Sequence, residues 1–248
     1  MRVSRDVAAP APALPAARRR ERFFYSGMAV AIVLTVFAGF SRTYYLKSYF
    51  GGAALSPMLH VHGLVFTSWL ALFFTQTVLV AAHRTDVHRR LGLAGGVLAA
   101  LVAVAGVVTS VVRAKQGAAP PGFPPLAFLA IPLGDMLVFT SLVGAGFSLR
   151  RRADTHKRLM LLATIGILPA AIARLPFEIM KAGPPAFFAL TDLFVAACVV
   201  YDLASRGRVH PATLWGGLVV VLSQPLRLMI SGTGAWLAVA NWLTGWAP

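Results

Sequence analysis

Long apolar runs alternate along the chain with short polar segments that are rich in basic residues. Each run holds about 20 residues, the length that a helix needs to cross the roughly 30 Å hydrocarbon layer of a membrane. Strands of a membrane barrel would alternate apolar and polar residues over about ten positions, and these runs do not alternate. The pattern therefore predicts an all-α, polytopic transmembrane helix bundle of about seven helices, at residues 23–41, 57–82, 91–113, 125–149, 157–176, 185–205 and 211–230.

A last apolar segment, 234–246, contains Trp236, Trp242 and Trp246. Tryptophan is favoured where the membrane meets water. We expect this segment either to extend the seventh helix or to lie in the interface.

The composition agrees with lipid as the main surroundings of this chain. Of its residues 58% are hydrophobic and 12% are charged, whereas soluble domains carry about 25% charged residues. The formal net charge is +15, but the basic residues gather in short clusters between apolar runs, as they do in cytoplasmic loops of membrane proteins. We therefore expect the lipid bilayer as a partner and no nucleic acid. The one cysteine, Cys198, lies inside an apolar run and excludes an intrachain disulfide.

The basic residues also predict the orientation of the helices. Sixteen of the 23 Lys and Arg residues lie in the N-terminal arm and in the loops after the second, fourth and sixth helices. Six lie on the opposite side, and Arg227 lies within the last helix. Because Lys and Arg concentrate in cytoplasmic loops, the N-terminus is predicted inside and, after seven crossings, the C-terminus outside.

Two regions divide the chain. Residues 1–20 are rich in Ala, Pro and Arg and are expected to form a disordered basic arm, and residues 21–248 form the transmembrane domain. A cleaved signal peptide is the competing interpretation of the first apolar run. That run is longer than a usual signal core and is not followed by a small-residue cleavage site, so we interpret it as a transmembrane helix.

Two short segments of the chain repeat a pattern. Residues 86–91 read Asp-Val-His-Arg-Arg-Leu, and residues 154–159 read Asp-Thr-His-Lys-Arg-Leu. Each opens an outward-going helix at its cytoplasmic start, which a duplicated helix pair would explain. An ordinary structural use is equally open, in which the Asp caps the helix and the basic side chains extend to the lipid headgroups.

Ionisable residues inside the predicted helices gather toward the outer half of the bundle. A charge within a membrane is costly, so it usually has a partner or faces an internal cavity. A rise of about 1.5 Å per residue places six such residues there, and they form our candidate cofactor-binding set: His60, His62, Asp135, Asp192, Arg174 and Arg227. The structural alternative is that Asp135 or Asp192 only forms an ion pair with Arg174 or Arg227.

The histidines suggest two alternative metal sites. His60 and His62 point about 160° apart on a regular helix, so they share a ligand only if the helix start is distorted. Imidazole and carboxylate ligands there would suit a divalent metal ion such as zinc, iron or copper. At the inner face, His83 or His88 together with His156 could ligate the iron of haem b. Solvated surface histidines are the simpler explanation.

Three motifs carry a resemblance to known proteins: His60-Val61-His62-Gly63, the two repeated segments, and residues 208–215, Arg-Val-His-Pro-Ala-Thr-Leu-Trp. They resemble a group of uncharacterised bacterial multi-pass membrane proteins, which implies a place in the bacterial inner membrane and no particular activity. A fainter similarity is to bis-histidine cytochrome b membrane proteins, which implies haem and exchange of electrons with quinone. The two-haem form of that family needs histidine pairs near both faces, and here the outer half has histidines from the second helix only.

Three functions follow as hypotheses. The first is a redox-linked protein with a haem, metal or quinone site in the bundle, where Arg174 and Arg227 stabilise an anionic group. The second is a small proton-coupled transporter or permease. The third is a non-enzymatic assembly subunit of a larger membrane complex. Hydrolase motifs and phosphate-binding glycine loops do not occur in the sequence, so whether the chain is an enzyme stays open.

Overall fold

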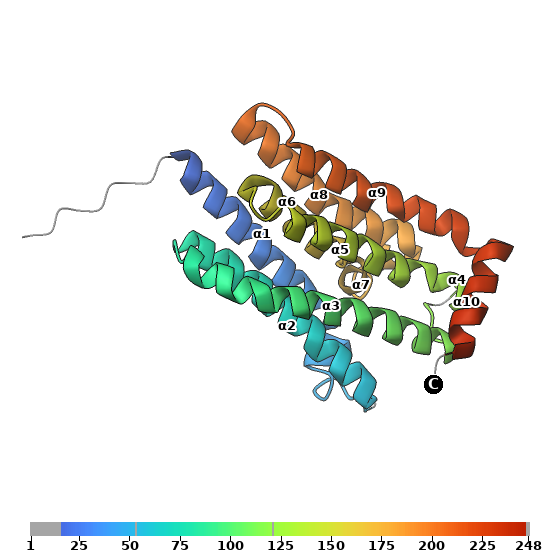
Figure 1. The fold of residues 1–248 in the computed structure, drawn as a ribbon. Helices are drawn as coiled ribbons and strands as arrows, with labels where there is room; N and C mark the ends of the chain where they lie inside the picture. The colour runs from blue at the N-terminus through green and yellow to red at the C-terminus, as the bar shows by residue number, and fades with distance from the viewer. Residues whose placement is uncertain (1–15, 53, 121, 247–248) are drawn as a thin grey trace, which may run out of the picture.

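The apolar runs of the sequence form the helices of one bundle (Figure 1). This computed structural model describes residues 16–52, 54–120 and 122–246, and every regular element in those ranges is a helix. In a helix the backbone N–H and C=O groups hydrogen-bond to each other, and lipid offers them no other partners. The elements are α1 (Ala16–Phe40), the π-helical turn η1 (Ser41–Tyr45), α2 (Pro57–Ala81), α3 (Thr85–Lys115), α4 (Pro125–Phe128), α5 (Ala130–Ser148), α6 (Ala153–Gly166), α7 (Pro169–Ile172), the 3-10 turn η2 (Glu178–Ala182), α8 (Pro184–Arg206), α9 (Pro211–Ser231) and α10 (Gly234–Trp246).

Six segments are long and apolar enough to cross a membrane: α1 with η1, α2, α3, α4 with α5, α8 and α9. Large apolar side chains point outward from them, and Leu93, Leu137 and Met229 are 80%, 68% and 75% exposed. Outward apolar surface of this extent indicates contact with lipid. The prediction of an all-α bundle is confirmed, and the six helices support a location in the membrane.

The predicted helix at 157–176 is interrupted in the structure. Helix α6 ends at Gly166, and α7 begins three residues later at Pro169. Proline has no N–H for the helical ladder and favours a break at this point. With 14 residues, α6 rises about 21 Å, less than the roughly 30 Å of hydrocarbon. Thus α6 is not among the six long helices, and the count of seven crossings stays a prediction.

Other boundaries also differ from the predicted ones: α1 begins at Ala16, α6 begins at Ala153, and the predicted helix 125–149 is divided into α4 and α5. Helix α3 begins at Thr85, six residues before the predicted 91, so the first repeated segment lies inside the helix. Helix α10 is a separate element and not an extension of α9. It lies across the end of the bundle (Figure 1), where the Trp236 indole N–H donates to the Leu126 carbonyl at 2.9 Å and Ala240 is fully buried.

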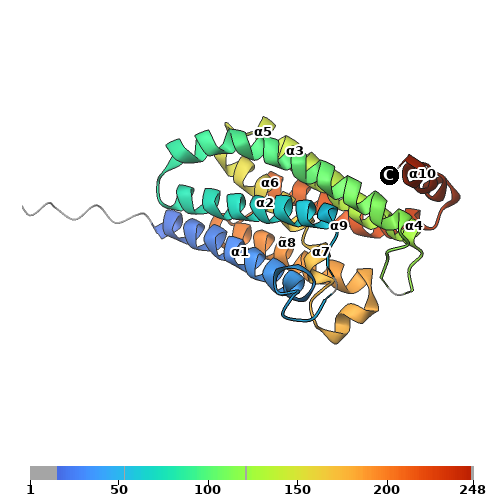
Figure 2. The same ribbon diagram turned by 90° about the horizontal axis from the view of Figure 1, so that it is seen from below.

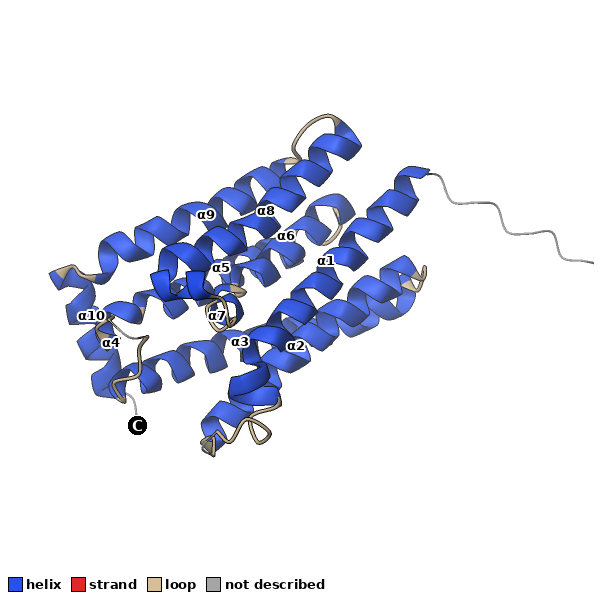
Figure 3. Cartoon of the chain, turned by 180° about the vertical axis from the view of Figure 1, so that it is seen from behind, coloured by secondary structure: helices blue, strands red, loops and turns tan. Residues whose placement is uncertain are grey.

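The bundle has two distinct ends. The start of α1 and the α2–α3 and α8–α9 loops lie together at one end (Figure 3), which we call the basic end. The other end carries η1, α4 and α10, and we call it the far end. Of the expected disordered arm 1–20, residues 1–15 lie outside the described ranges, and residues 16–20 form the first turns of α1.

Helices α5 and α6 lie at the centre of the bundle. Phe139 of α5 and Ile165 of α6 are fully buried, and α2 and α3 pack side by side along one flank with α1 next to α2 (Figure 2). Helix α1 approaches α7 so closely that a Cβ on Gly39 would overlap the backbone of Ala171. A glycine at position 39 is therefore what lets α7 pack against α1.

Candidate functional site

The far end contains a cavity of about 870 Å³, within the range of roughly 300–1,000 Å³ that is usual for small-molecule sites. Its wall comes from η1, the start of α2, the end of α3, the start of α5 and the region of α7. Three of the predicted site residues, His62, Asp135 and Arg174, line it. The other polar or charged side chains on the wall include Arg42, Tyr44, Tyr45, Lys47, Thr67, Thr109, Ser110 and Arg113.

The π-helical turn η1 forms one side of this cavity. The Tyr44 hydroxyl donates to the His60 carbonyl at 3.3 Å, and the Tyr45 and Thr67 hydroxyls are hydrogen-bonded at 2.9 Å. A Cβ on Gly63 would overlap the Tyr44 ring, so this glycine gives the ring its place against α2. Single π-helical turns occur frequently at functional sites, and here the turn presents two tyrosines to the cavity.

His60 and His62 do not form a joint site. Helix α2 is regular from Pro57, so the two side chains diverge as the periodicity predicts. His60 is exposed and does not line the cavity, while His62 is half-buried in its wall. Among the described residues, no group of three or more His, Cys, Asp and Glu side chains could hold a metal ion. The geometry therefore gives no support to a metal held by His60 and His62 together.

The His62 ring is held in one orientation. It stacks on Phe66 with ring centroids 4.2 Å apart, and its Nδ1 lies 3.4 Å from the Ala105 carbonyl oxygen. Because a carbonyl only accepts, this contact places the proton on Nδ1 and leaves the lone pair on Nε2. His62 thus has an Nε2 with a free lone pair, which can accept a hydrogen bond from a ligand.

Asp135 and Arg227 form a buried ion pair between α5 and α9, and each side chain is 6% exposed. Arg227 also donates to the Ser223 hydroxyl at 2.8 Å and to the Ile131 carbonyl at 3.4 Å. Gly134 lies directly under the Arg227 side chain, where a Cβ would not fit. The expected salt bridge is confirmed for this pair. Asp135 lines the cavity with its charge already neutralised, and Arg227 lies behind it.

Asp192 and Arg174 do not pair with each other or with Asp135. Asp192 accepts a hydrogen bond from the Gln224 amide at 2.8 Å and lies outside the cavity. The Arg174 guanidinium lies over the Phe40 ring at 4.8 Å and donates to a backbone carbonyl. Of the six predicted residues, the structure thus places three on the cavity wall and three off it, namely His60, Asp192 and Arg227.

The cavity carries an excess of positive charge. Arg42, Lys47, Arg113 and Arg174 line it, and none of them forms an ion pair with a carboxylate in the described part of the chain. Arg113 donates to the Gln116 side chain, and Arg42 lies over the Phe50 ring. A site with cations and apolar walls favours a ligand that combines an apolar body with anionic or strongly electronegative oxygens.

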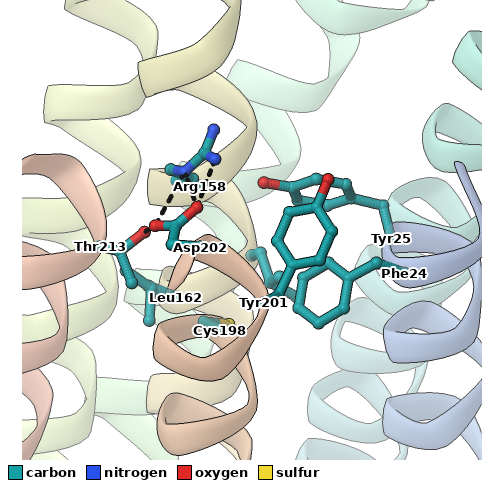
Figure 4. Close-up of a pocket in the computed structure, with 9 residues that line it drawn as sticks. Phe24, Tyr25, Arg158, Leu162, Cys198, Tyr201, Asp202 and Thr213 are labelled. Carbon is teal, nitrogen blue, oxygen red and sulfur yellow. Dashed lines mark hydrogen bonds and ion pairs between the residues drawn. The ribbon is translucent and has the colours of Figure 1, made fainter. Parts of the chain in front are cut away.

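The sequence analysis missed a second buried network, at the basic end (Figure 4). Arg158 of α6 pairs with Asp202 of α8 at 2.5 Å, with side chains 5% and 1% exposed. Asp202 also accepts from the Thr213 hydroxyl at 2.5 Å and from the His210 backbone N–H at 3.1 Å. The alternative in which the basic side chains of the repeated segments extend to the headgroups does not hold for Arg158, which is buried. An available signal was Asp202 itself, a carboxylate near the end of an apolar run that must find a partner.

This network is packed and not hollow. Figure 4 shows Phe24, Tyr25 and Tyr201 beside it, and the Phe24 and Tyr201 rings stack with centroids 4.0 Å apart. The surrounding gap leaves no space for a water molecule. The arrangement joins α1, α6, α8 and α9, so its role is to hold helices together and not to bind a ligand.

His210, in the loop between α8 and α9, caps the start of α9. Its Nδ1 accepts a hydrogen bond from the Ala212 backbone N–H at 3.0 Å. Burial lowers the pKa of His210, and the nearby Arg158 and Arg206 charges add to this effect. The neutral ring is the form that can accept the capping bond.

Two of the three inner histidines proposed for haem come together. His83 is exposed and contacts Arg22, whereas the rings of His88 and His156 lie 6.3 Å apart.

Searches with family models, curated proteins and solved structures return no match for the chain. Function must therefore be inferred from the two ends of the bundle themselves.

Proposed function

We propose that the chain is a redox-linked protein of the bacterial inner membrane that binds a quinone-type ligand in the far-end cavity. The observation that carries this proposal is the cavity of about 870 Å³ lined by His62 and by four cations that have no carboxylate partner among the described residues. A quinone ring suits the apolar wall, and its oxygens become anionic on reduction. Arg113 and Arg174 would hold those oxygens by charge-assisted hydrogen bonds, His62 would offer Nε2 as a hydrogen-bond acceptor, and an external electron donor would reduce the quinone.

The ion pair between Asp135 and Arg227 argues against the transporter hypothesis. A proton-coupled permease needs a carboxylate that binds and releases a proton during the cycle. Asp135 is the acidic residue among those described on the cavity wall, and its carboxylate is engaged in the buried pair with Arg227. Uptake of substrate into proteoliposomes that is lost in Asp135→Asn would favour the permease over the quinone site.

The assembly-subunit hypothesis predicts a different effect of mutations in the same cavity. If the polar residues only fix helix packing, their replacement should change stability and not ligand affinity. Co-purification with a larger membrane complex, together with quinone affinity that does not depend on Arg174 or His62, would favour this role.

The binding test uses the full chain in detergent micelles, titrated with a short-chain quinone and followed by calorimetry. A charge-assisted hydrogen bond contributes about 1.5–3 kcal/mol, so Arg174→Gln and Arg113→Gln should each weaken binding about 10-fold or more. Lys181→Gln is the matched control, because Lys181 is an exposed cation outside the cavity that pairs with Glu178. Equal affinity in all three variants, or binding of a fatty acid in place of the quinone, would contradict the proposal.

We also propose seven crossings with the N-terminus in the cytoplasm and the C-terminus outside. The excess of Lys and Arg at the basic end supports this orientation, and α6 with α7 supplies the fifth, interrupted crossing. α10, with its tryptophans, then lies in the outer interface. Single cysteines at Arg151 and Gln116, both exposed, should react with an impermeant reagent only from the cytoplasmic and the outer side, respectively. The reverse labelling would overturn the orientation.

A further inference from the structure

The two repeated segments bring their histidines together at the basic end. His88 lies in the first turn of α3 and His156 in the first turn of α6, each at the third position of its segment. Their ring centroids are 6.3 Å apart, and the ring planes make an angle of 77°. The redox site at the far end does not involve this pair, so the repeat needs an explanation of its own.

One nitrogen of His156 is free for a ligand. Its Nδ1 lies 2.8 Å from the Gly146 carbonyl oxygen, so Nδ1 carries the proton and Nε2 carries the lone pair. Histidines that bind metal ions usually donate their other ring N–H in this way, which fixes the tautomer and the ring orientation. His156 thus has the orientation of a metal ligand before any ion is present.

Two buried polar atoms beside this pair lack hydrogen-bond partners in the described part of the chain, namely His88 Nδ1 and Gln76 Oε1. The Gln76 amide on α2 donates to the His88 backbone carbonyl at 3.2 Å, so Gln76 lies against the first turns of α3. Buried polar groups are nearly always hydrogen-bonded, and an exception indicates a water or an ion at the site. Both atoms belong to residues joined by the Gln76–His88 contact, so one partner can be sought for the two.

The spacing of the rings suits one metal ion between them. Metal-to-imidazole bonds are about 2.0–2.1 Å, and with about 1.1 Å from each nitrogen to its ring centre a straight nitrogen–metal–nitrogen arrangement separates the centroids by about 6.3 Å. The observed separation is also 6.3 Å, so the spacing of the rings is the one that a wide ligand angle requires. Smaller angles would need the rings to approach.

We propose that His88, His156 and Gln76 form a binding site for a divalent transition-metal ion, with Cu²⁺ the tightest. Two imidazoles and an amide oxygen are ligands for copper, nickel or zinc and not for Ca²⁺ or Mg²⁺, which prefer carboxylate and other oxygen donors. Affinity rises to a maximum at copper along the divalent series. Arg89 and Arg90 follow His88, but both are exposed, so water and salt screen their charge.

Haem would use the same two histidines, but the packing is too close for it. The Phe147 ring lies 6.4 Å from the His156 ring. The same ring would be 3.5 Å from a Cβ added to Gly96 of α3. Phe147 therefore fills the space between α3 and α5 that a porphyrin would occupy, which favours a single ion.

The test uses the full chain, purified with a histidine-free tag, stripped with a chelator and titrated with Cu²⁺. We expect one ion per chain by mass spectrometry of the metal content. The electron paramagnetic resonance spectrum of the loaded wild-type protein should show coupling to two imidazole nitrogens. His88→Ala and His156→Ala should each weaken binding at least 100-fold, while the control His83→Ala, at the same end, should leave it unchanged.

Several results would overturn the metal site. If Cu²⁺ binding persists in both variants, or if the spectrum shows no coupling to two imidazole nitrogens, the bound copper is an adventitious ion only. A wild-type protein that binds no stoichiometric copper would mean that a water satisfies the two buried atoms. A Soret band that disappears in His88→Ala would replace the ion with haem. Quinone affinity, measured on the same samples, reports on the far end alone, so the two proposals can fail separately.

Discussion

Replacement of Asp202 by alanine is the sharpest test of the packing at the basic end. The Arg158 and Asp202 side chains are 5% and 1% exposed. Removal of one partner from a buried ion pair costs about 3–5 kcal/mol, because the other charge stays buried without compensation. Arg158 keeps its hydrogen bond to the Asp154 carbonyl at 2.9 Å, so we expect the lower end of the range, about 3 kcal/mol.

The same reasoning predicts how a double variant behaves. Arg158→Met with Asp202→Leu removes both charges and fills the space with apolar atoms. Such replacements are often neutral, so most of the stability lost in Asp202→Ala should return. The exposed pair of Arg84 and Asp86, 3.8 Å apart, supplies the control, since Asp86→Ala at the surface should cost less than about 1 kcal/mol.

The assay is thermal unfolding of the purified chain in one detergent, followed by circular dichroism. For a chain of this size, about 3 kcal/mol corresponds to a fall in Tm of roughly 6–12 °C. A fall of less than about 2 °C in Asp202→Ala, or a double variant as unstable as the single one, would refute the assignment of Asp202 as a buried partner of Arg158.

The remaining predictions concern α1 and the α9 cap. Gly39→Ala should lower the free energy of unfolding by about 1–3 kcal/mol through overpacking against Ala171. The control Gly27→Ala, with open space around its Cβ, should leave it unchanged. Equal Tm values for the two variants would contradict the close approach of α1 to α7. Because the pKa of His210 is lowered on folding, the unfolded chain binds more protons just below the ordinary value of about 6.5, so stability should fall as the pH drops from 7 to 5. His210→Asn retains a capping oxygen without titrating, and its Tm should depend less on pH across that interval; an unchanged pH dependence would show that His210 is not responsible.

The helical class and most helix positions could be predicted from apolar periodicity and length alone. The boundaries of α2, α8 and α9 match the predicted runs to within a residue at each end, because apolar length is what selects residues for a bilayer. The interruption between α6 and α7 could be predicted less well. Pro169 indicated a kink, but the end of α6 at Gly166 also depends on the close packing of α1 against Ala171.

Which of the candidate site residues contact each other could be predicted only in part. The sequence showed that Asp135 and Arg227 are costly in a membrane and need partners, and their pairing follows from charge and depth. It did not show that Asp192 would bond to Gln224, or that Arg158 would be buried with Asp202. Helix rotation decides which face a side chain joins, and rotation depends on contacts with all neighbouring helices.

The sequence by itself determined an apolar helical bundle with a basic end and a set of charged residues in its helices, because the energy of placing residues in lipid depends on their composition and spacing. Only the tertiary structure decided which of those residues meet. The division of the candidate site into a cavity with His62 and Arg174, a buried Asp135–Arg227 pair and an outlying Asp192 comes from helix packing. So does the meeting of His88 and His156, 68 positions apart in the chain.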